Sequence, residues 1–256
     1  MKYFLLFGDI GAGKSSVGNS LLNEDVFDVG ENTTDRCTQE IKIALVLKRK
    51  LFGDLTIIDT PGIGKTRDEK QVFHRAILNN KEVICKIDKV DAFVLVVKFN
   101  NDQASSFVAS ADEFVKLFSV RALSSLVVLC IQVGTKRYGI NNFDEVIKNS
   151  NGYKHLAERF GDKIEYCLWD NVKPFRHQEE KLNSIVSRLD SFPGSRLESL
   201  LLISDYVQSY FDNEQDEPMS KQKKRLSSLR RMFSLKDLKK NHLWKFIPLF
   251  YLRFIF

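Results

Sequence analysis

The segment Gly8-Asp-Ile-Gly-Ala-Gly-Lys-Ser15 limits the possible folds of this chain more than any other feature. It fits the pattern G-x-x-x-x-G-K-[ST], with an apolar run directly before it and a helical pattern directly after it. In that setting, glycines let successive backbone N–H groups surround phosphate groups, whose charge also meets a helix N-terminus. The preceding run, Tyr3–Phe7, is too short for the apolar core of a signal peptide, so we predict that it is the first strand.

This loop and the start of its helix are predicted to contact a nucleotide. Lys14 would reach the β- and γ-phosphates as a point charge, and Ser15 would place its hydroxyl on Mg²⁺, which prefers hard oxygen ligands. A chance match in a glycine-containing turn is the alternative, and the flanking strand and helix argue against it. The predicted nucleotide-binding residues of this segment are Asp9, Ile10, Gly11, Ala12, Gly13, Lys14, Ser15 and Ser16.

A second element on the phosphate side is Asp59-Thr-Pro-Gly62, which follows the apolar run Leu55–Ile58. An aspartate at the end of a strand can hold Mg²⁺ through water, and the Gly62 N–H can bond a γ-phosphate. Alone, this is an ordinary turn sequence. Together with the phosphate loop, it favours a GTPase over adenylate kinases and transporters.

The segment between these elements, Phe27–Thr38, contains threonines but no regular periodicity. A switch segment needs a hydroxyl that closes on the metal only when the γ-phosphate is present. We predict that Thr34 has this role, with Thr33 and Thr38 as alternatives, because loop threonines commonly form turns. The predicted metal ligands are Ser15, Thr34 and Asp59.

Apolar runs bounded by turn residues alternate with segments of helical periodicity along the first part of the chain. The runs are Tyr3–Phe7, Ile41–Leu47, Leu55–Ile58, Ala92–Val97, Leu126–Ile131 and Ile164–Trp169. The helical segments are Ser15–Leu22, Gln71–Lys86, Ser106–Phe118, Tyr153–Phe160 and Glu179–Leu189. This alternation predicts an α/β fold of the P-loop NTPase type, with a mostly parallel six-stranded sheet and helices on both faces. The short link Lys48–Asp54 predicts a hairpin, and therefore one antiparallel edge strand.

Composition and charge divide the chain into four expected parts. Residues 1–191 would form the nucleotide-binding domain, 192–212 a helical extension, 213–220 a linker and 221–256 a basic and aromatic tail. The net charge of +6 is concentrated in the tail. Four widely spaced cysteines without a CxxC pair predict reduced thiols in a cytoplasmic protein rather than a disulfide framework or zinc site. They are Cys37, Cys85, Cys130 and Cys167.

The tail has the pattern of a membrane-surface anchor. Apolar residues within 221–240 lie among lysines and arginines, at a spacing that gives a helix one apolar stripe and one cationic face. The aromatic segment Leu243–Phe256 is shorter than the roughly 20 residues that span a bilayer as a helix. We therefore predict peripheral binding to an anionic membrane. Packing of the aromatic end on the domain and nucleic-acid binding are alternatives, and nucleic acid is not the predicted partner.

Several motifs resemble the GTPases of the immunity-associated protein family, also called the avirulence-induced-gene type, which are relatives of septins and chloroplast import receptors. The resemblance covers about residues 3–191. The matching segments are GKSSVGNSLL, Thr34-Asp-Arg-Cys37, IIDTPGI, DAFVLVVKF, FGDKIEYCLWDN and the closing helix from Glu179. It implies a domain that binds GTP or GDP with Mg²⁺, forms homo-oligomers when loaded with GTP and often lies beside a membrane.

The residues that would read the base depart from the family pattern. In the segment after the fifth strand, Thr135 and Lys136 match the first positions of the guanine-reading box, but Tyr138 stands where its acid is expected. Near the sixth strand, Asn171 matches the family's aromatic-asparagine-asparagine element, and Asp170 replaces its first asparagine. We predict nucleotide contacts for Thr135, Lys136 and Asn171, and guanine preference follows from the resemblance alone.

The turn Asp59–Gly62 also differs from the corresponding turn of fast GTPases, which is followed directly by a water-orienting glutamine. Here that residue is Ile63, so we expect slow GTP hydrolysis and assign no catalytic residue. Arg67, His74 or Arg75 could act across a dimer, although each could equally be a solvated helix charge. The predicted function is a slow GTP-dependent switch. The alternatives are a non-hydrolysing pseudo-GTPase scaffold and, less favoured, an ATP-using P-loop protein.

Overall fold

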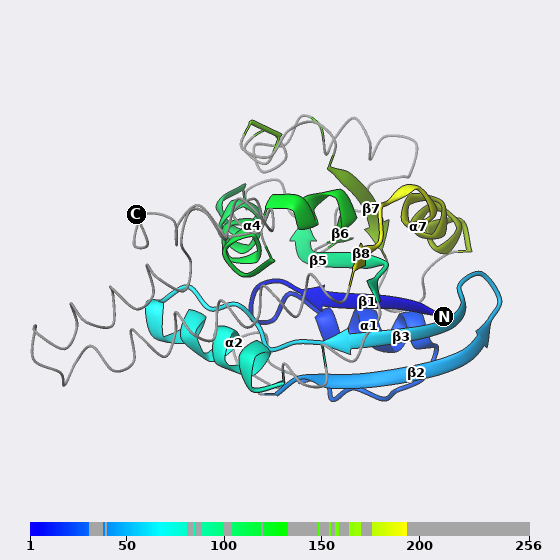
Figure 1. Cartoon of the computed structure of the whole chain (residues 1–256), viewed down its shortest axis with the longest axis horizontal. Coiled ribbons are helices and arrows are strands. Elements are labelled where there is room, and N and C mark those ends of the chain that lie inside the picture. The colour runs from blue at the N-terminus through cyan, green and yellow to red at the C-terminus, as the bar shows by residue number, and fades with distance from the viewer. Residues whose placement is uncertain are drawn as a thin grey trace, which may run out of the picture.

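The computed structural model describes residues 1–30, 38, 40–80, 84, 89–99, 104–118, 120–132, 148, 154, 157–158, 164–169 and 176–193. Within this part, a six-stranded sheet carries helices on both faces (Figure 1). The predicted extension, linker and tail lie outside the described residues, as does most of the predicted helix Tyr153–Phe160. No helix of the described part is long and apolar enough to cross a membrane.

The sheet has the strand order β2-β3-β1-β5-β6-β7, in which only β2 is antiparallel to its neighbour. The strands are β1 (Lys2–Phe7), β2 (Lys42–Arg49), β3 (Gly53–Asp59), β5 (Ala92–Phe99), β6 (Leu126–Gln132) and β7 (Glu165–Trp169). The predicted fold class is therefore confirmed, including the antiparallel edge strand. All of these strands except β2 run parallel, so their carboxyl ends share one edge of the sheet, where ligands of open α/β sheets bind.

Within the described residues, four helices cover the sheet. They are α1 (Lys14–Leu22), α2 (Arg67–Asn79), α4 (Ala104–Phe118) and α7 (Arg176–Arg188). α2 begins earlier than its apolar periodicity predicts, because Thr66 and Glu69 form a capping box that starts the helix at Arg67. The short hairpin link is also confirmed, with Gly53 at φ 71° in the left-handed region.

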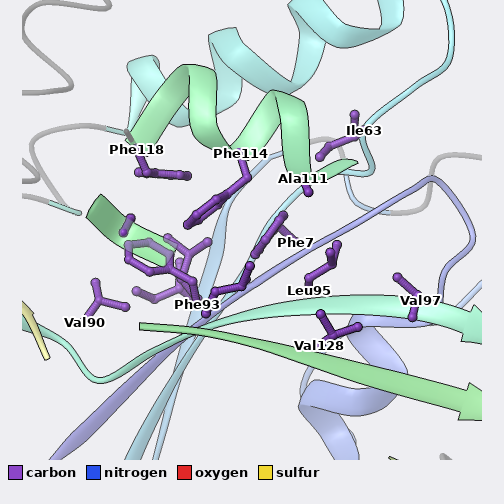
Figure 2. Packing of buried hydrophobic residues seen from close by; sticks show 14 of the residues in the cluster. Phe7, Ile63, Val90, Phe93, Leu95, Val97, Ala111, Phe114, Phe118 and Val128 are labelled. Carbon is purple, nitrogen blue, oxygen red and sulfur yellow. The ribbon is translucent and has the colours of Figure 1, made fainter. Parts of the chain in front are cut away.

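The buried apolar side chains of the described residues form two clusters, one on each face of the sheet. One lies beneath α2 and α4 and includes Phe73, Phe114 and Phe118, as Figure 2 shows for the two phenylalanines of α4. Phe7 and Phe114 stack there with ring centroids 4.6 Å apart. The other cluster lies beneath α1 and α7 and includes Leu21 and Leu182. Burial on both faces explains why most strands read as continuous apolar runs.

Two small elements were not expected from the sequence. β4 (Lys89–Val90) pairs antiparallel with β8 (Phe192–Pro193), and a 3₁₀ helix, η1 (Val120–Ser125), precedes β6. The side chain of Asp91 accepts hydrogen bonds from Tyr3 N, Lys89 Nζ and Ser191 Oγ, and so connects the start of β1 with residues near both short strands. These hydrogen bonds join the two ends of the described domain near the amino end of β1, opposite the phosphate loop.

Candidate phosphate and metal site

The predicted phosphate loop connects the carboxyl end of β1 to the N-terminus of α1. Gly13 precedes α1 with φ 95°, a conformation that favours glycine. Gly8 also has a positive φ, and a side chain there would overlap the carbonyl oxygen of Val96 in β5. The loop therefore lies directly on the sheet, at the N-terminus of a helix, which is the geometry of an anion-binding site.

Lys14 is buried, with 6% of its surface exposed, and its ammonium group is hydrogen-bonded to the start of the phosphate loop. Its Nζ donates to the carbonyl oxygens of Gly8 at 3.2 Å and of Asp9 at 2.9 Å. These bonds keep a positive charge over the concave side of the loop. A polyphosphate there would gain a charge-assisted contact, which is stronger than a neutral hydrogen bond.

Ser15 and Asp59, which are 44 positions apart in the sequence, meet at 2.7 Å between Ser15 Oγ and Asp59 Oδ2. Asp59 is fully buried, and its Oδ1 makes no hydrogen bond within the described part of the chain. Burial raises the pKa of the Asp59 carboxyl above its ordinary value, although the hydrogen bond from Ser15 and the charge of Lys14 act in the opposite direction. A buried carboxylate oxygen is stabilised by a hydrogen-bond donor, an ordered water molecule or a cation, and a metal ion beside Ser15 would supply the last of these.

Thr38 completes a group of three oxygens. Its Oγ1 lies 3.1 Å from Ser15 Oγ and 3.3 Å from Asp59 Oδ2. Neighbouring oxygens around an octahedral Mg²⁺ lie roughly 3 Å apart, because each Mg–O distance is about 2.1 Å. The donor set therefore fits Mg²⁺. The predicted ligand Thr34 and its alternative Thr33 lie outside the described residues, so Thr38 is the threonine that the structure places beside the other two ligands.

The second turn, Asp59–Gly64, is docked on the phosphate loop. Thr60 Oγ1 donates to Leu6 O at 2.7 Å, which joins the turn to β1. Ile63 N donates to Gly8 O at 2.9 Å, and Ile10 N donates to Ile63 O at 3.2 Å. A side chain at Gly62 would come within 2.5 Å of the Cα atom of Ile10, so only glycine permits this approach.

The side chain of Ile63 is buried in the core. It is 2% exposed and belongs to the cluster beneath α2 and α4, near Ala111 in Figure 2. The side chain that follows the Asp-x-x-Gly turn is therefore part of the packing. It cannot polarise a water molecule from this position.

The residues considered for action across a dimer differ in their surroundings. His74 lies against Glu113 of α4, with 3.2 Å between His74 Nε2 and Glu113 Oε2. Arg75 is exposed on α2, and the side chain of Arg67 lies outside the described residues. Of these, only Arg75 is shown with a side chain on the surface.

Comparison with known proteins agrees with this geometry. The sequence profile of the AIG1 family matches residues 2–199, which is most of the chain. The chain belongs to the AIG1 family. This confirms the resemblance to avirulence-induced-gene GTPases that its motifs indicate.

Solved structures share the fold of this AIG1-family chain at low sequence identity. Toc33 from Arabidopsis thaliana, in complex with Mg²⁺ and GMPPNP, is 17% identical, with a TM-score of 0.51 over 75% of this chain and 87% of that one. A variant of Era from Aquifex aeolicus, bound to GDP and aluminium fluoride, is 16% identical, with a TM-score of 0.53 over 74% and 58%. A structure of the chloroplast translocon components atToc33 and psToc159 is 16% identical, with a TM-score of 0.50 over 74% and 84%.

The predicted contacts with the nucleotide base fall in two segments, one after β6 and one after β7. Thr135, Lys136, Tyr138, Asp170 and Asn171 all lie outside the described residues. Their predicted contacts stay predictions.

Sequence reasoning missed two residues of α4, one that contacts the phosphate loop and one that contacts α2. Ser110 Oγ donates to Asp9 Oδ1 in the phosphate loop. Glu113 is buried and pairs with α2. One signal was available, because both residues lie on the apolar side of a strongly amphipathic helix, where a charged residue needs a partner.

Proposed function

We propose that this chain is a guanine-nucleotide-dependent switch, which binds GTP or GDP with Mg²⁺, hydrolyses GTP slowly and forms homo-oligomers when GTP is bound. The observation that carries the proposal is the convergence of Ser15, Thr38 and Asp59 beside the Lys14 ammonium. The bound metal would neutralise phosphate charge. Ser15 and Asp59 would hold it from the rigid part of the fold, and Thr38 from a segment that can respond to the γ-phosphate.

Slow hydrolysis is supported by the burial of Ile63, which leaves the turn without a side chain that could orient water. The same observation favours a second candidate function, a scaffold that binds nucleotide and does not hydrolyse it. Self-association separates the two candidates, because a partner subunit could supply the missing group. Dimerization is described as important for the GTPase activity of the chloroplast translocon components atToc33 and psToc159.

Preference for guanine is supported by membership of the AIG1 family and by the GDP-bound and GMPPNP-bound states of the structures with this fold. The proposal also includes the expected location, a cytoplasmic protein whose residues 221–256 bind an anionic membrane surface. ATP use is retained as an outcome of the first experiment below.

The full-length chain should be titrated with fluorescent GTP, GDP and ATP in Mg²⁺, and phosphate release should be followed at increasing protein concentration. Tight GTP binding with release per molecule that rises with concentration supports the switch. Tight binding without release supports the scaffold. A preference for ATP would overturn the assignment.

Two substitutions at the site refine this test. Lys14→Ala should weaken GTP and GDP binding about 100-fold or more while the protein stays folded, since it removes a charge-assisted contact. Ser15→Asn should weaken GTP binding more than GDP binding, because the metal bridges β- and γ-phosphates only in the triphosphate. Equal losses for both nucleotides in Ser15→Asn would count against the metal role.

The threonine that closes on the metal can be identified by comparing Thr34→Ala with Thr38→Ala. The contacts of Thr38 lead us to propose that Thr38→Ala prevents GTP-dependent assembly and leaves GDP affinity unchanged. If Thr34→Ala alone has that effect, Thr34 is the ligand, as the sequence predicts.

The tail is tested by sedimentation with liposomes that contain or lack anionic lipid. The full-length chain is expected to bind anionic liposomes, and less so as salt rises, because basic side chains near the surface each add about 1 kcal/mol that salt screens. A chain that ends at Ser220 and sediments equally well would contradict the proposed anchor.

A further inference from the structure

Glu113 of α4 is a buried carboxylate that faces α2. It is 2% exposed, and its Oε1 accepts a hydrogen bond from Lys70 Nζ at 3.0 Å. Its Oε2 lies 3.2 Å from His74 Nε2, a contact without hydrogen-bond geometry. Lys70 and His74 are four positions apart on α2, so both side chains lie on the same face of that helix.

In this arrangement, the free-energy cost of burying the Glu113 carboxylate depends on the position of α2. A buried carboxylate is costly unless cations and hydrogen bonds compensate it, and removing one of its partners raises that cost. If α2 moved away, Glu113 would lose the Lys70 ammonium while α4 still held it in the core. Glu113 therefore favours the arrangement in which α2 lies against α4.

The same helix also contacts the phosphate loop. Ser110, one turn before Glu113, donates to the Asp9 carboxylate in that loop. Between them, Ala111 packs in the cluster that contains Ile63 of the second turn. One face of α4 thus contacts the phosphate loop, the turn that carries Gly62 and the helix that follows it.

The arrangement that Glu113 stabilises is the one in which the second turn lies on the phosphate loop. In it, Gly62 approaches Ile10 too closely for any side chain, and Thr38 lies beside Ser15 and Asp59. A γ-phosphate and its metal would strengthen these contacts, whereas a diphosphate would not.

We propose that Glu113 is a positioning residue, which holds α2 through Lys70 and His74 so that Gly62 stays on the phosphate loop and GTP is favoured over GDP. This inference rests on the proposed guanine-nucleotide switch. It extends the proposal to a residue outside the phosphate loop and the predicted metal ligands.

The test is the ratio of affinities for a non-hydrolysable GTP analogue and for GDP, measured on the full-length chain in Mg²⁺. Glu113→Gln keeps the shape of the side chain and removes its charge. It is expected to lower the preference for the GTP analogue at least about fivefold, as for an ordinary coupling between sites, with GDP affinity nearly unchanged. Lys70→Met keeps the aliphatic stem and should lower the preference in the same direction.

Glu165→Gln is the matched control, since Glu165 pairs with Arg188 at 3.0 Å on the opposite side of the sheet from α2. It should leave the ratio unchanged. Lys70 is 29% exposed, so Lys70→Met decides the matter if Glu113→Gln does not fold. An unchanged ratio in the folded variants, with normal GTP binding by the unaltered chain, would overturn the role of Glu113 alone. Absence of GTP binding by the unaltered chain would overturn the proposed function as well.

Discussion

Beneath α1 and α7, the cluster on one face of the sheet is apolar, and the ion pair that joins α7 to the β2–β3 hairpin lies at its margin. That pair, Arg49 and Glu179, leaves 19% of each side chain exposed. Beneath α2 and α4, by contrast, a carboxylate lies within the packed layer, with 3% of the Glu113 side chain exposed. The cluster on this face also contains Ile63, which follows Gly62 in the turn that lies on the phosphate loop.

This difference suggests that packing on the two faces of the sheet has different consequences. Apolar packing beneath α1 and α7 is non-directional, because each buried side chain contributes through the apolar area that it removes from water. Beneath α2 and α4, a buried ion pair and a turn that lies on the phosphate loop make stability depend on the position of α2. We therefore expect changes beneath α1 and α7 to alter stability alone, and changes beneath α2 and α4 to alter nucleotide preference as well.

The largest effects are expected from truncating one core side chain on each face. Phe114→Ala should lower the free energy of unfolding by about 3–5 kcal/mol and Leu182→Ala by about 2–5 kcal/mol, because each leaves a cavity. Only Phe114→Ala should also lower the ratio of GTP to GDP affinity, since Phe114 packs in the cluster of Ile63. Urea denaturation and nucleotide titration measure both quantities. Equal changes in the ratio would break the distinction between the faces.

Ile63→Gln tests whether the second turn could be made catalytic by one substitution. Because Ile63 is buried, the amide should cost about 1–3 kcal/mol of stability, and phosphate release should not become faster. Val72→Gln, at an exposed position of α2, is the control and should be nearly neutral. Faster release in Ile63→Gln would show that the side chain can reach the nucleotide.

Gly62→Ala should weaken GTP binding about tenfold, or about 1.4 kcal/mol, and leave GDP binding unchanged. The added methyl group would overlap Ile10 and push the turn off the phosphate loop. Gly53→Ala is the matched control, because Gly53 has a positive φ but open space around it. It should reduce stability through backbone strain without changing either affinity. A loss of GDP binding in Gly62→Ala would mean that the turn supports the loop itself.

The smallest effect is expected for Glu179→Gln, which weakens the partly exposed pair with Arg49. A pair of this exposure contributes about 1 kcal/mol or less, so the free energy of unfolding should fall by no more than that. The ratio of GTP to GDP affinity should not change. A shift in the ratio as large as that expected for Glu113→Gln would remove the contrast between the two ion pairs.

Most of the sheet could be predicted because its signals are local. Each strand appears as an apolar run, and the phosphate loop is defined by residues that are adjacent in the sequence. The start of α2 at Arg67 was missed, although the capping box of Thr66 and Glu69 that causes it is also local. The short strands β4 and β8 left no such signal, since two residues are too few to show a period.

The sequence alone determined the α/β class and the strand, loop and helix around Gly8–Ser15, because backbone preferences and a short motif specify them. Only the tertiary structure decided that Ile63 is buried, that Thr38, Ser15 and Asp59 lie side by side and that α4 contacts the phosphate loop. Lys70 and Glu113 are 43 positions apart, and Ser110 and Asp9 are 101 apart. Contacts over such separations depend on how the helices pack across the sheet, which no local pattern of residues records.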